Sequence, residues 1–257
     1  MKKQIGIRQI QLIDDLVSHF IKSKGQFSVL LDSLNSNIEH SENIKKLIHS
    51  TKSRIKDPEH LKNKLIRKAN DAITSNTPYS YTKENLFLKV NDLAGFRILH
   101  LHTKQFQKID TELKKIFTEQ QWKIVEGPNA RTWDDESRSY FESIGVGTSA
   151  NPNMYTSVHY IISPNTSSAI TCEIQVRTLM EEVWGEVDHS INYPLKSESL
   201  SCREQIKTLA RVTSSCSRLV DSIFTTNEYE KSRNALAPPA PAAKLVKEVV
   251  NKKSQKK

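Results

Sequence analysis

The 257-residue chain is poor in glycine and cysteine. Its 7 glycines are few for this length, which argues against an extensive all-β architecture with many tight turns. Its 3 cysteines, Cys172, Cys202 and Cys216, form no Cys-x-x-Cys pair. A disulfide framework and a zinc framework are therefore both unexpected, and we expect a reducing compartment.

Long hydrophobic runs are also missing. No apolar run approaches the roughly 20 residues that span a bilayer. The first residues, M-K-K-Q-I-G-I-R, have no apolar core of the kind that a secretory signal carries. We expect a cytoplasmic protein with no membrane partner.

Positive charge is what the chain has in excess. Its formal net charge is +9, which favours a polyphosphate or nucleic-acid partner, although part of the excess lies in the C-terminal tail. A chain of this length buries on the order of 70% of its unfolded surface, so it can form a sizeable core.

Apolar residues at helical spacing predict packing helices at both ends of the chain and one in the middle. The stretches with this pattern are residues 8–22, 26–50, 105–120 and 200–225. The third is expected to face inward through Phe106, Ile109, Leu113 and Phe117. The Ala- and Pro-rich run over 235–243 predicts a linker, which a short basic tail follows.

A basic helix is predicted to begin at Asp57-Pro58, since proline suits the first helical position. The cationic residues around this start are Arg54, Lys56, His60, Lys64, Arg67 and Lys68. Cations around a helix N-terminus can hold phosphate. The alternative is a solvated basic face.

Residues 86–102 form the most strand-like run, and Asp92 lies within it among apolar neighbours. Burying a lone carboxylate is costly, so Asp92 is expected to have a partner, either a divalent metal or an arginine such as Arg97. Residues 126–154 are predicted to be a long loop or flap.

Two further strands carry polar side chains on one face, because side chains alternate along a strand. Residues 155–160 place Tyr155, Ser157 and His159 together, and the tyrosine and histidine can stack on a nucleobase. The run from Ile170 places Glu173, Gln175 and Arg177 together. In both strands the alternative is a wetter face turned to solvent.

A helix is predicted after this last strand. Thr178 can cap it, with Glu181 three residues on as in a capping box. Its apolar stripe is expected to consist of Met180, Val183, Trp184 and Val187.

Together these elements predict an α+β fold with a mixed central β-sheet flanked by helices. If Asp92 and Glu173 lie on adjacent strands, they can flank one Mg²⁺, while the cations of residues 54–68 hold a polyphosphate. The sequence therefore predicts a nucleotidyl- or pyrophosphoryl-transfer site.

Four motifs resemble the RelA/SpoT-type alarmone synthetases, especially the small single-domain members. They are S-R-I-K-D-P-E-H-L-x-x-K-L-x-R-K, D-L-A-G-F-R, Y-T-S-V-H and E-I-Q-V-R-T-x-x-x-E-x-W-x-E-x-D-H, in family order over roughly residues 53–193. The resemblance implies a nucleotidyltransferase-like core. It also implies transfer of the β,γ-pyrophosphate of ATP to the ribose 3′-hydroxyl of GDP or GTP, which makes (p)ppGpp.

The resemblance also implies a role for each matching residue. On the ATP side, Arg54 and Arg97 would stack on the adenine, and Lys56, Lys64 and Arg67 would contact the phosphates. Asp92 and Glu173 would bind Mg²⁺, with Glu173 also accepting the proton of the 3′-hydroxyl. On the acceptor side, Tyr155 would stack on the base, His159 would position the acceptor, and Gln175 and Arg177 would support the site.

Some positions depart from the family pattern. Asn151 stands where the family often has lysine, Met154 where it has glycine, and His60 where serine is common. Between Arg138 and Lys196 the only Lys or Arg is Arg177, which predicts an acceptor pocket with few cations. The 3′ end of a tRNA, which has no free 5′-polyphosphate, is therefore a rival acceptor, and another free purine nucleotide is a further alternative. A catalytically inactive nucleotide-binding regulatory domain is the alternative from a different class.

We expect four parts in the chain: packing helices over 1–50, a RelA/SpoT-like core over 51–195, a C-terminal helix over 196–233, and the linker and basic tail over 234–257. No His-Asp dipeptide occurs, so the hydrolase of the long family members is not expected in this chain. A homo-oligomer and a separate hydrolase or neutralising antitoxin are the protein partners left open.

Overall fold

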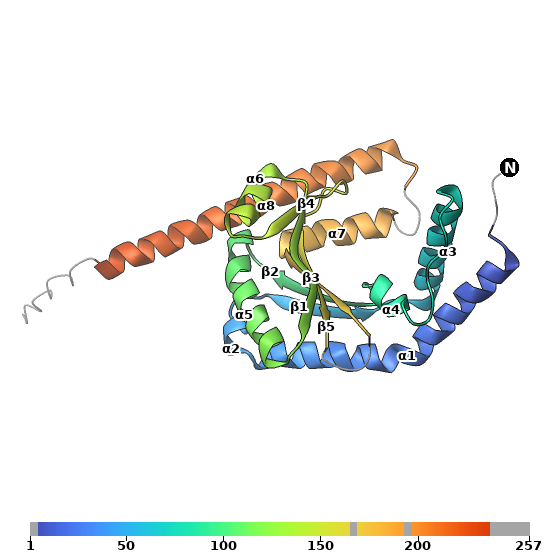
Figure 1. The fold of residues 1–257 in the computed structure, drawn as a ribbon. Helices are drawn as coiled ribbons and strands as arrows, with labels where there is room; N and C mark the ends of the chain where they lie inside the picture. The colour runs from blue at the N-terminus through green and yellow to red at the C-terminus, as the bar shows by residue number, and fades with distance from the viewer. Residues whose placement is uncertain (1–4, 165–168, 193–196, 237–257) are drawn as a thin grey trace, which may run out of the picture.

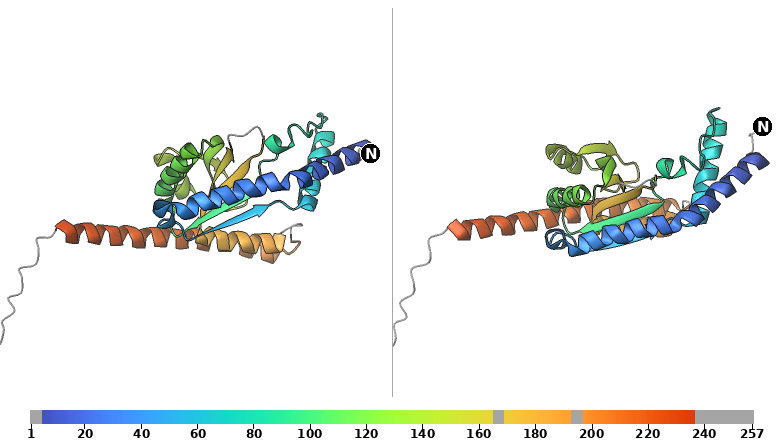
Figure 2. Two further views of the ribbon diagram at one scale, coloured as in Figure 1. Left: turned by 90° about the horizontal axis from the view of Figure 1, so that it is seen from below. Right: turned by 60° about the horizontal axis from the view of Figure 1, so that its bottom comes forward.

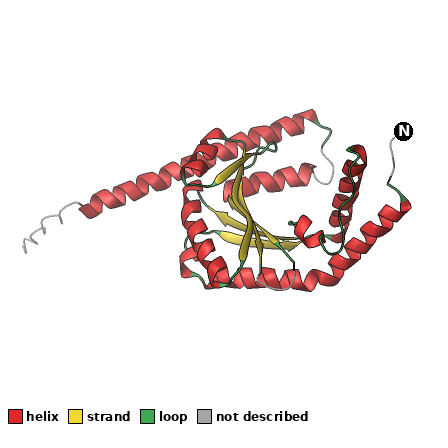
Figure 3. Cartoon of the chain, viewed as in Figure 1, coloured by secondary structure: helices red, strands yellow, loops and turns green. Residues whose placement is uncertain are grey.

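A computed structural model describes residues 5–164, 169–192 and 197–236. Its centre is a curved, mixed β-sheet of six described strands in the order β1-β2-β6-β5-β3-β4 (Figures 1 and 3). The strands are β1 (Ser50–Ile55), β2 (Ala94–His100), β3 (Lys123–Thr132), β4 (Gly147–Ala150), β5 (Ser157–Ser163) and β6 (Cys172–Thr178). The α+β fold with a mixed sheet is the one that the sequence predicts.

Helices cover this sheet. They are α1 (Ile7–His40), α2 (Glu42–Lys45), α3 (Pro58–Thr74), α4 (Leu86–Lys89), α5 (Phe106–Glu119), α6 (Asp135–Ser143), α7 (Leu179–Asn192) and α8 (Leu200–Leu236). Helix α1 crosses one face of the sheet, and α7 and α8 lie on the opposite side (Figure 2). The C-terminal part of α8 extends well beyond the sheet (Figure 1).

The sheet has an apolar face and a polar face. Strands β2 and β6 are parallel, with Gly95 opposite Glu173 and Arg97 opposite Gln175. Because neighbours in register point to the same side, the polar side chains of β1, β2, β6 and β5 share one face. Phe96 and Ile174, which alternate with them, are buried in the main core on the other face.

Helix α1 runs unbroken for 34 residues, so the prediction of separate helices over 8–22 and 26–50 is wrong. Gly25 lies inside the helix, and an interior glycine costs only about 1 kcal/mol. The apolar stripe stays in phase across it, from Phe20 to Phe27 and Leu34, all fully buried. The segment after His40 forms the short α2 and then β1, a strand that the sequence did not predict.

The basic helix and the amphipathic helix are confirmed. Helix α3 has Pro58 in its first turn, and the Asp57 side chain accepts hydrogen bonds from the Glu59 and His60 amides. Helix α5 buries its expected inward residues Phe106, Ile109, Leu113 and Phe117.

Residues 126–154 are not a long loop. They contain most of β3 together with α6 and β4. The first residues of β3 are exposed, and its pairing with β5 has two register irregularities, so the strand shows no simple alternation in the sequence. Backbone pairing, which composition does not reveal, defines this strand.

Two strand boundaries also differ from expectation. The run over 86–102 begins with α4 and a turn, so Asp92 lies two residues before β2 and not within a strand. Strand β5 begins at Ser157, so Tyr155 precedes the strand. No helix of the described residues is long and apolar enough to cross a membrane. The predicted linker over 235–243 lies almost wholly outside the described residues, and the basic tail entirely so.

Helix α7 faces the sheet through acidic residues, and the predicted apolar stripe is only partly buried. Trp184 of that stripe is buried as expected, but Glu181 and Glu182 are buried in place of Val183 and Val187, which are exposed. The reason is the polar face of the sheet, whose cations attract the acidic side of the helix. The predicted cap is present, since the Glu181 amide donates to Thr178 Oγ1 at 3.2 Å.

Candidate active site

Asp92 is held by two lysines from separate elements. Lys56 Nζ, just after β1, lies 2.8 Å from one carboxylate oxygen, and Lys64 Nζ of α3 lies 2.7 Å from the other. Burial acts to raise the pKa of Asp92, but the hydrogen bonds from Lys56 and Lys64 outweigh it and lower that pKa. The predicted partner Arg97 is not among these contacts, so lysines take the place that the sequence suggested for an arginine.

Glu173 of β6 is held in a similar way. Its carboxylate accepts hydrogen bonds from His159 Nδ1 on β5 and from Gln175 Nε2, both at 2.9 Å. Burial acts to raise the pKa of Glu173, and the bonds from His159 and Gln175 lower it, while the charge of Asp92 acts to raise it. The two carboxylates are thus close enough to influence each other electrostatically.

A cavity of about 410 Å³ opens on one side of these carboxylates. Its lining combines cations, carboxylates and an aromatic ring: Arg54, Lys64, Lys89, Asn91, Asp92, Glu126, Arg131, Tyr155, His159, Ile161, Glu173 and Gln175. The Nε2 atom of His159 is buried and has no hydrogen-bond partner within the described chain, so it is available to a ligand.

A second cavity of about 320 Å³ lies over β1, β2 and α7. It is lined by Lys52, Ser53, Arg54, Asp92, Gly95, Phe96, Arg97, Glu173, Gln175, Glu186 and His189. Asp92, Glu173, Gln175 and Arg54 line both cavities. Two compartments therefore share one boundary, and the two carboxylates lie on it.

Arg54 and Arg97 line the second cavity from neighbouring strands, where Arg54 lies opposite Gly95. A Cβ at Gly95 would lie 3.6 Å from Arg54 Cγ, so the Arg54 side chain crosses the bare backbone of β2. Arg97 Nη1 lies 3.2 Å from Glu182 and 2.9 Å from Glu186, both on α7. These contacts fix one arginine while leaving it on the cavity wall.

Glu182 is the centre of the contact between α7 and the sheet. It accepts hydrogen bonds from Lys52, Arg97 and Arg177, which lie on β1, β2 and β6. Burial opposes the charge of Glu182, but Arg177 and the other cations lower its pKa well below the ordinary value. Gly185 lets the helix pass closely, because a Cβ there would lie 3.0 Å from Arg177 Nη1.

Tyr155 lies in a tight segment before β5. Its ring stacks on Trp184 of α7, with centroids 5.8 Å apart and planes 29° apart, and is 6.5 Å from the His159 ring. Met154 has a φ of 62°, the left-handed conformation that favours glycine, so the position keeps the geometry expected of the family glycine. Asn151 is buried and donates from Nδ2 to the Tyr155 carbonyl at 2.8 Å.

The cavity lined by Tyr155 and His159, two of the predicted acceptor-binding residues, is not poor in cations. Lys89 and Arg131 line the larger cavity beside Tyr155, together with Lys64. Both residues precede the cation-poor stretch between Arg138 and Lys196: Lys89 ends α4, and Arg131 lies in β3, where the sequence predicts a loop. The Arg131 side chain makes no hydrogen bond or ion pair within the described chain.

Three predicted residues line neither cavity. Lys56 is paired with Asp92, Arg67 is exposed on α3, and Arg177 is buried against Glu182. Arg177 instead lines a third cavity of about 240 Å³ beside Trp184 and Tyr155. The remaining predicted residues are brought together at or beside the shared boundary.

The two carboxylates fit a magnesium ion. Mg²⁺ prefers oxygen ligands and is held by one or two carboxylates together with substrate phosphates and water. Asp92 and Glu173 provide such a pair on one boundary, and the described residues contain no cluster of three or more metal-binding side chains that would suggest a closed site.

The fold and the site define an enzyme with two ligand compartments, cationic walls and two carboxylates between them, as expected of a transferase acting on nucleotide phosphates. A family model described as "Region found in RelA / SpoT proteins" matches residues 53–198. The chain belongs to this family and is a pyrophosphotransferase of the (p)ppGpp synthetase type.

Relatives in sequence and structure agree with this placement. The chain is 28% identical over 178 residues to the GTP pyrophosphokinase YwaC of Bacillus subtilis (strain 168), covering 67% of this chain and 69% of that protein. A GTP pyrophosphokinase family protein from Streptococcus pneumoniae has a similar fold, with a TM-score of 0.57, 17% identity and coverage of 88% and 98%. Small alarmone synthetase 1 from Bacillus subtilis gives a TM-score of 0.56, 16% identity and coverage of 84% and 99%.

Proposed function

We propose that the protein transfers the β,γ-pyrophosphate of ATP to the ribose 3′-hydroxyl of GDP or GTP. The observation that carries this proposal is the boundary of Asp92 and Glu173 between two cavities. A group transfer between two nucleotides needs two adjoining sites with the reacting groups held where they meet.

The smaller cavity is the proposed donor site. Arg54 and Arg97 line it from adjacent strands, and flat guanidinium groups suit stacking on adenine. Lys56 and Lys64 pair with Asp92, which lines both cavities, and would move between Asp92 and the incoming phosphates, Lys64 from the side of the larger cavity. Arg67, exposed on α3, is proposed as an outer contact only.

The larger cavity is the proposed acceptor site. The Tyr155 ring would stack on the base, and the free Nε2 of His159 would bond the acceptor. Lys89 and Arg131 would meet its 5′-phosphates, which is why a free nucleotide fits better than a tRNA end. Gln175 supports Glu173 at the boundary, and Arg177 supports it indirectly through Glu182.

Asp92 and Glu173 would hold Mg²⁺, which supplies neutralisation of the charge that develops during pyrophosphoryl transfer. Glu173 is the proposed proton acceptor for the 3′-hydroxyl. Its lowered pKa keeps it deprotonated at neutral pH, and His159 and Gln175 fix its orientation.

The test offers ATP labelled at the γ-phosphate with GDP, GTP, AMP or deacylated tRNA in separate reactions. We expect the label to move to GDP or GTP and to require Mg²⁺. Label that moves only to tRNA would establish the toxin-type alternative, and label that moves only to AMP would establish an adenine acceptor. No transfer in any reaction would favour the inactive binding domain.

A separate hydrolase or a neutralising antitoxin, and a cytoplasmic location, stay predictions from the sequence. Both kinds of partner follow from the proposed product, because an enzyme that only makes an alarmone needs another protein to limit it.

A further inference from the structure

The peptide unit that joins Tyr155 to Thr156 is held at both of its polar atoms. Its carbonyl oxygen accepts from Asn151 Nδ2 at 2.8 Å, and its amide donates to Glu181 Oε2 at 3.0 Å. Asn151 and Glu181 are only 6% and 4% exposed. Two buried side chains from different elements thus fix the plane of one peptide.

The two side chains are themselves anchored. The Asn151 amide donates to the Thr132 carbonyl on β3, and Asn151 Oδ1 accepts from the Asn153 amide. Glu181 lies in the first turn of α7, where its own amide donates to Thr178 Oγ1. Asn151 and Glu181 together form what we call the clamp. The clamp links the short segment around Tyr155 to β3 on one side and to α7 on the other.

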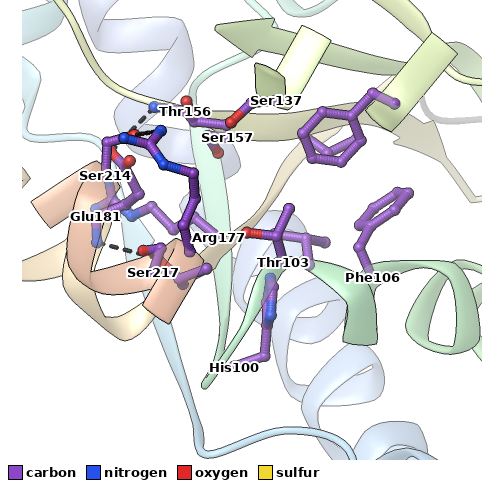
Figure 4. Close-up of a pocket in the computed structure, with 15 residues that line it drawn as sticks. His100, Thr103, Phe106, Ser137, Thr156, Ser157, Arg177, Glu181, Ser214 and Ser217 are labelled. Carbon is purple, nitrogen blue, oxygen red and sulfur yellow. Dashed lines mark hydrogen bonds between the residues drawn. The ribbon is translucent and has the colours of Figure 1, made fainter. Parts of the chain in front are cut away.

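Next to these two side chains is a small cavity of about 20 Å³, which Figure 4 shows with Ser157, Arg177 and Glu181 among its lining residues. Two buried atoms on these residues, Ser157 Oγ and Arg177 Nε, have no hydrogen-bond partner within the described chain. A cavity of this size holds about one water molecule, and a water bonded to both atoms would satisfy them.

We propose that Asn151 and Glu181 are positioning residues for the acceptor, which fix the Tyr155–Thr156 peptide and thereby the Tyr155 ring. This rests on the proposed function, in which that ring stacks on the acceptor base. Neither residue lines the donor or the acceptor cavity, so both act through Tyr155.

Tyr155 needs such a clamp because it precedes β5 and has no strand pairing of its own. Apart from the clamp, its ring is placed by stacking on Trp184. Loss of either hydrogen bond would let the ring leave the acceptor cavity. Acceptor binding would weaken, while the ATP site over β1 and β2 would stay as it is.

The test compares Glu181→Met and Asn151→Ala with the wild type. We expect each variant to raise the acceptor KM about tenfold, the effect of losing one buried hydrogen bond, while the KM for ATP stays nearly unchanged. Glu181→Gln is the conservative variant, because its amide oxygen can still accept from the Thr156 amide, and it should keep most of the acceptor affinity. The double variant should raise the acceptor KM by a smaller factor than the product of the factors for the two single variants, because both hydrogen bonds hold the same peptide unit.

Asp221→Ala is the matched control. The Asp221 carboxylate is partly buried, with 13% of the side chain exposed, and accepts hydrogen bonds from the Lys104 backbone amide of a distant segment at 2.9 Å and from the His102 ring at 2.8 Å. This variant should lower Tm without changing the acceptor KM. An equal rise of both KM values in Glu181→Met, no rise at all, or the same acceptor effect in Asp221→Ala would overturn the proposal.

A pH profile gives a second readout. The ionisable side chains around Glu181 are His100, Asp134, Arg177, Glu182 and Arg218. Burial raises the pKa of Glu181 to about 7, whereas burial lowers the pKa of His100 to about 4, so His100 stays neutral in this range. A carboxylate accepts more strongly than a carboxylic acid, so the wild-type acceptor KM should rise as pH falls below about 7. The acceptor KM of Glu181→Gln should not show this rise at low pH. If the pH profiles of the acceptor KM were identical in the wild type and in Glu181→Gln, that result would count against the clamp.

Amide hydrogen exchange separates this proposal from the proposed function. If no acceptor receives pyrophosphate, the proposed function fails, but the Thr156 amide can still be followed. Its exchange should become at least about tenfold faster in Glu181→Met and stay unchanged in Asp221→Ala. Exchange that is unchanged in both variants would show that Glu181 does not hold the peptide.

Discussion

Asp92 and Glu173 are each compensated by protein groups before any substrate binds. Asp92 has two lysines, and Glu173 has a histidine and a glutamine. A buried carboxylate with such partners keeps its charge at neutral pH, which is the state needed to bind a cation or accept a proton. The partners also keep both side chains on the boundary between the cavities.

Asp92→Asn and Glu173→Gln should each lower pyrophosphate transfer by about 10²-fold or more, because each removes a charge that the reaction uses. Steady-state rates with saturating Mg²⁺ check this. Asp14→Asn on α1, which removes an equal charge from an exposed ion pair with Lys62 of α3, should keep the wild-type rate. Near-normal turnover of either site variant would contradict the assigned roles.

The Arg131 side chain should favour the binding of acceptors that carry a 5′-polyphosphate over acceptors that do not. Arg131→Ala should raise the KM for GDP or GTP by about 10- to 100-fold, the effect of losing a charged hydrogen bond, and leave the KM for ATP unchanged. Arg138→Ala is the control, since Arg138 pairs with Asp135 on the exposed side of α6. Equal effects of the two variants would remove Arg131 from the acceptor site.

Glu181 should make stability depend on pH. Burial raises its pKa from 4.5 to about 7, so the folded state binds the proton more tightly than the unfolded state does. The protonated Glu181 side chain therefore contributes to the free energy of unfolding. This contribution is fully present below about pH 4.5 and is lost as the pH rises to about 7. Glu181→Gln should therefore gain up to about 3 kcal/mol in unfolding free energy over the wild type at pH 8 and nothing near pH 4.5. Denaturant unfolding at both pH values measures this, and a constant difference would contradict it.

At the scale of elements, α3 brings Lys64 to Asp92, and the start of this helix is fixed by its cap. Asp57→Ala should lower the unfolding free energy by about 1 kcal/mol, because the Glu59 and His60 amides lose their acceptor. Asp71→Ala, exposed near the other end of the helix, should change it little. Chemical denaturation of both variants makes the comparison, and equal losses would show that the cap is not the cause.

Local patterns in the sequence predicted α3, α5 and β6, because each is specified by a short signal. Asp57-Pro58 marks a helix start, and the alternation around Glu173 marks a strand. Strand β3 gives no such signal, since its exposed first half is defined by pairing with β5 residues that lie 35 to 40 positions farther along the chain. For the same reason Arg131 was missed.

The buried side of α7 was predicted wrongly for a different reason. Hydrophobicity places Val183 and Val187 inward, but Arg97 and Arg177 on the sheet make the acidic side of the helix the better fit. The partners of Asp92 likewise depend on how β1 and α3 lie beside the turn before β2. Contacts between segments that are distant in the sequence determine both the buried side of α7 and the partners of Asp92. A residue pattern within one segment carries no information about such contacts.

For the whole molecule, α7 and α8 leave aliphatic side chains on the surface. Val183, Val187, Ile191, Val212, Leu219 and Ile223 are between 39% and 62% exposed. Val212, Leu219 and Ile223 recur at spacings of seven and four residues, so they form one stripe along α8. An exposed apolar stripe of this kind favours association with another protein surface.

We expect a homo-oligomer that uses this stripe. Leu219→Lys should shift the mass measured by light scattering toward that of one chain, because a charge would then be buried in the interface. Lys231→Glu, farther along the exposed end of α8, is a control that should leave the mass unchanged. A wild-type chain that is monomeric at high concentration would contradict the expectation.

Helix α7 contacts both proposed ligand sites. Glu182 and Glu186 hold Arg97 at the proposed donor site, and Trp184 supports Tyr155 at the proposed acceptor site. Any change that a bound donor nucleotide caused in the Arg97 contacts would therefore reach the Tyr155 ring through this one helix. By thermodynamic reciprocity, the factor by which ATP changes the affinity for the second nucleotide must equal the factor by which that nucleotide changes the affinity for ATP. Binding of one substrate then strengthens or weakens binding of the other, and the contacts of α7 influence which substrate binds first.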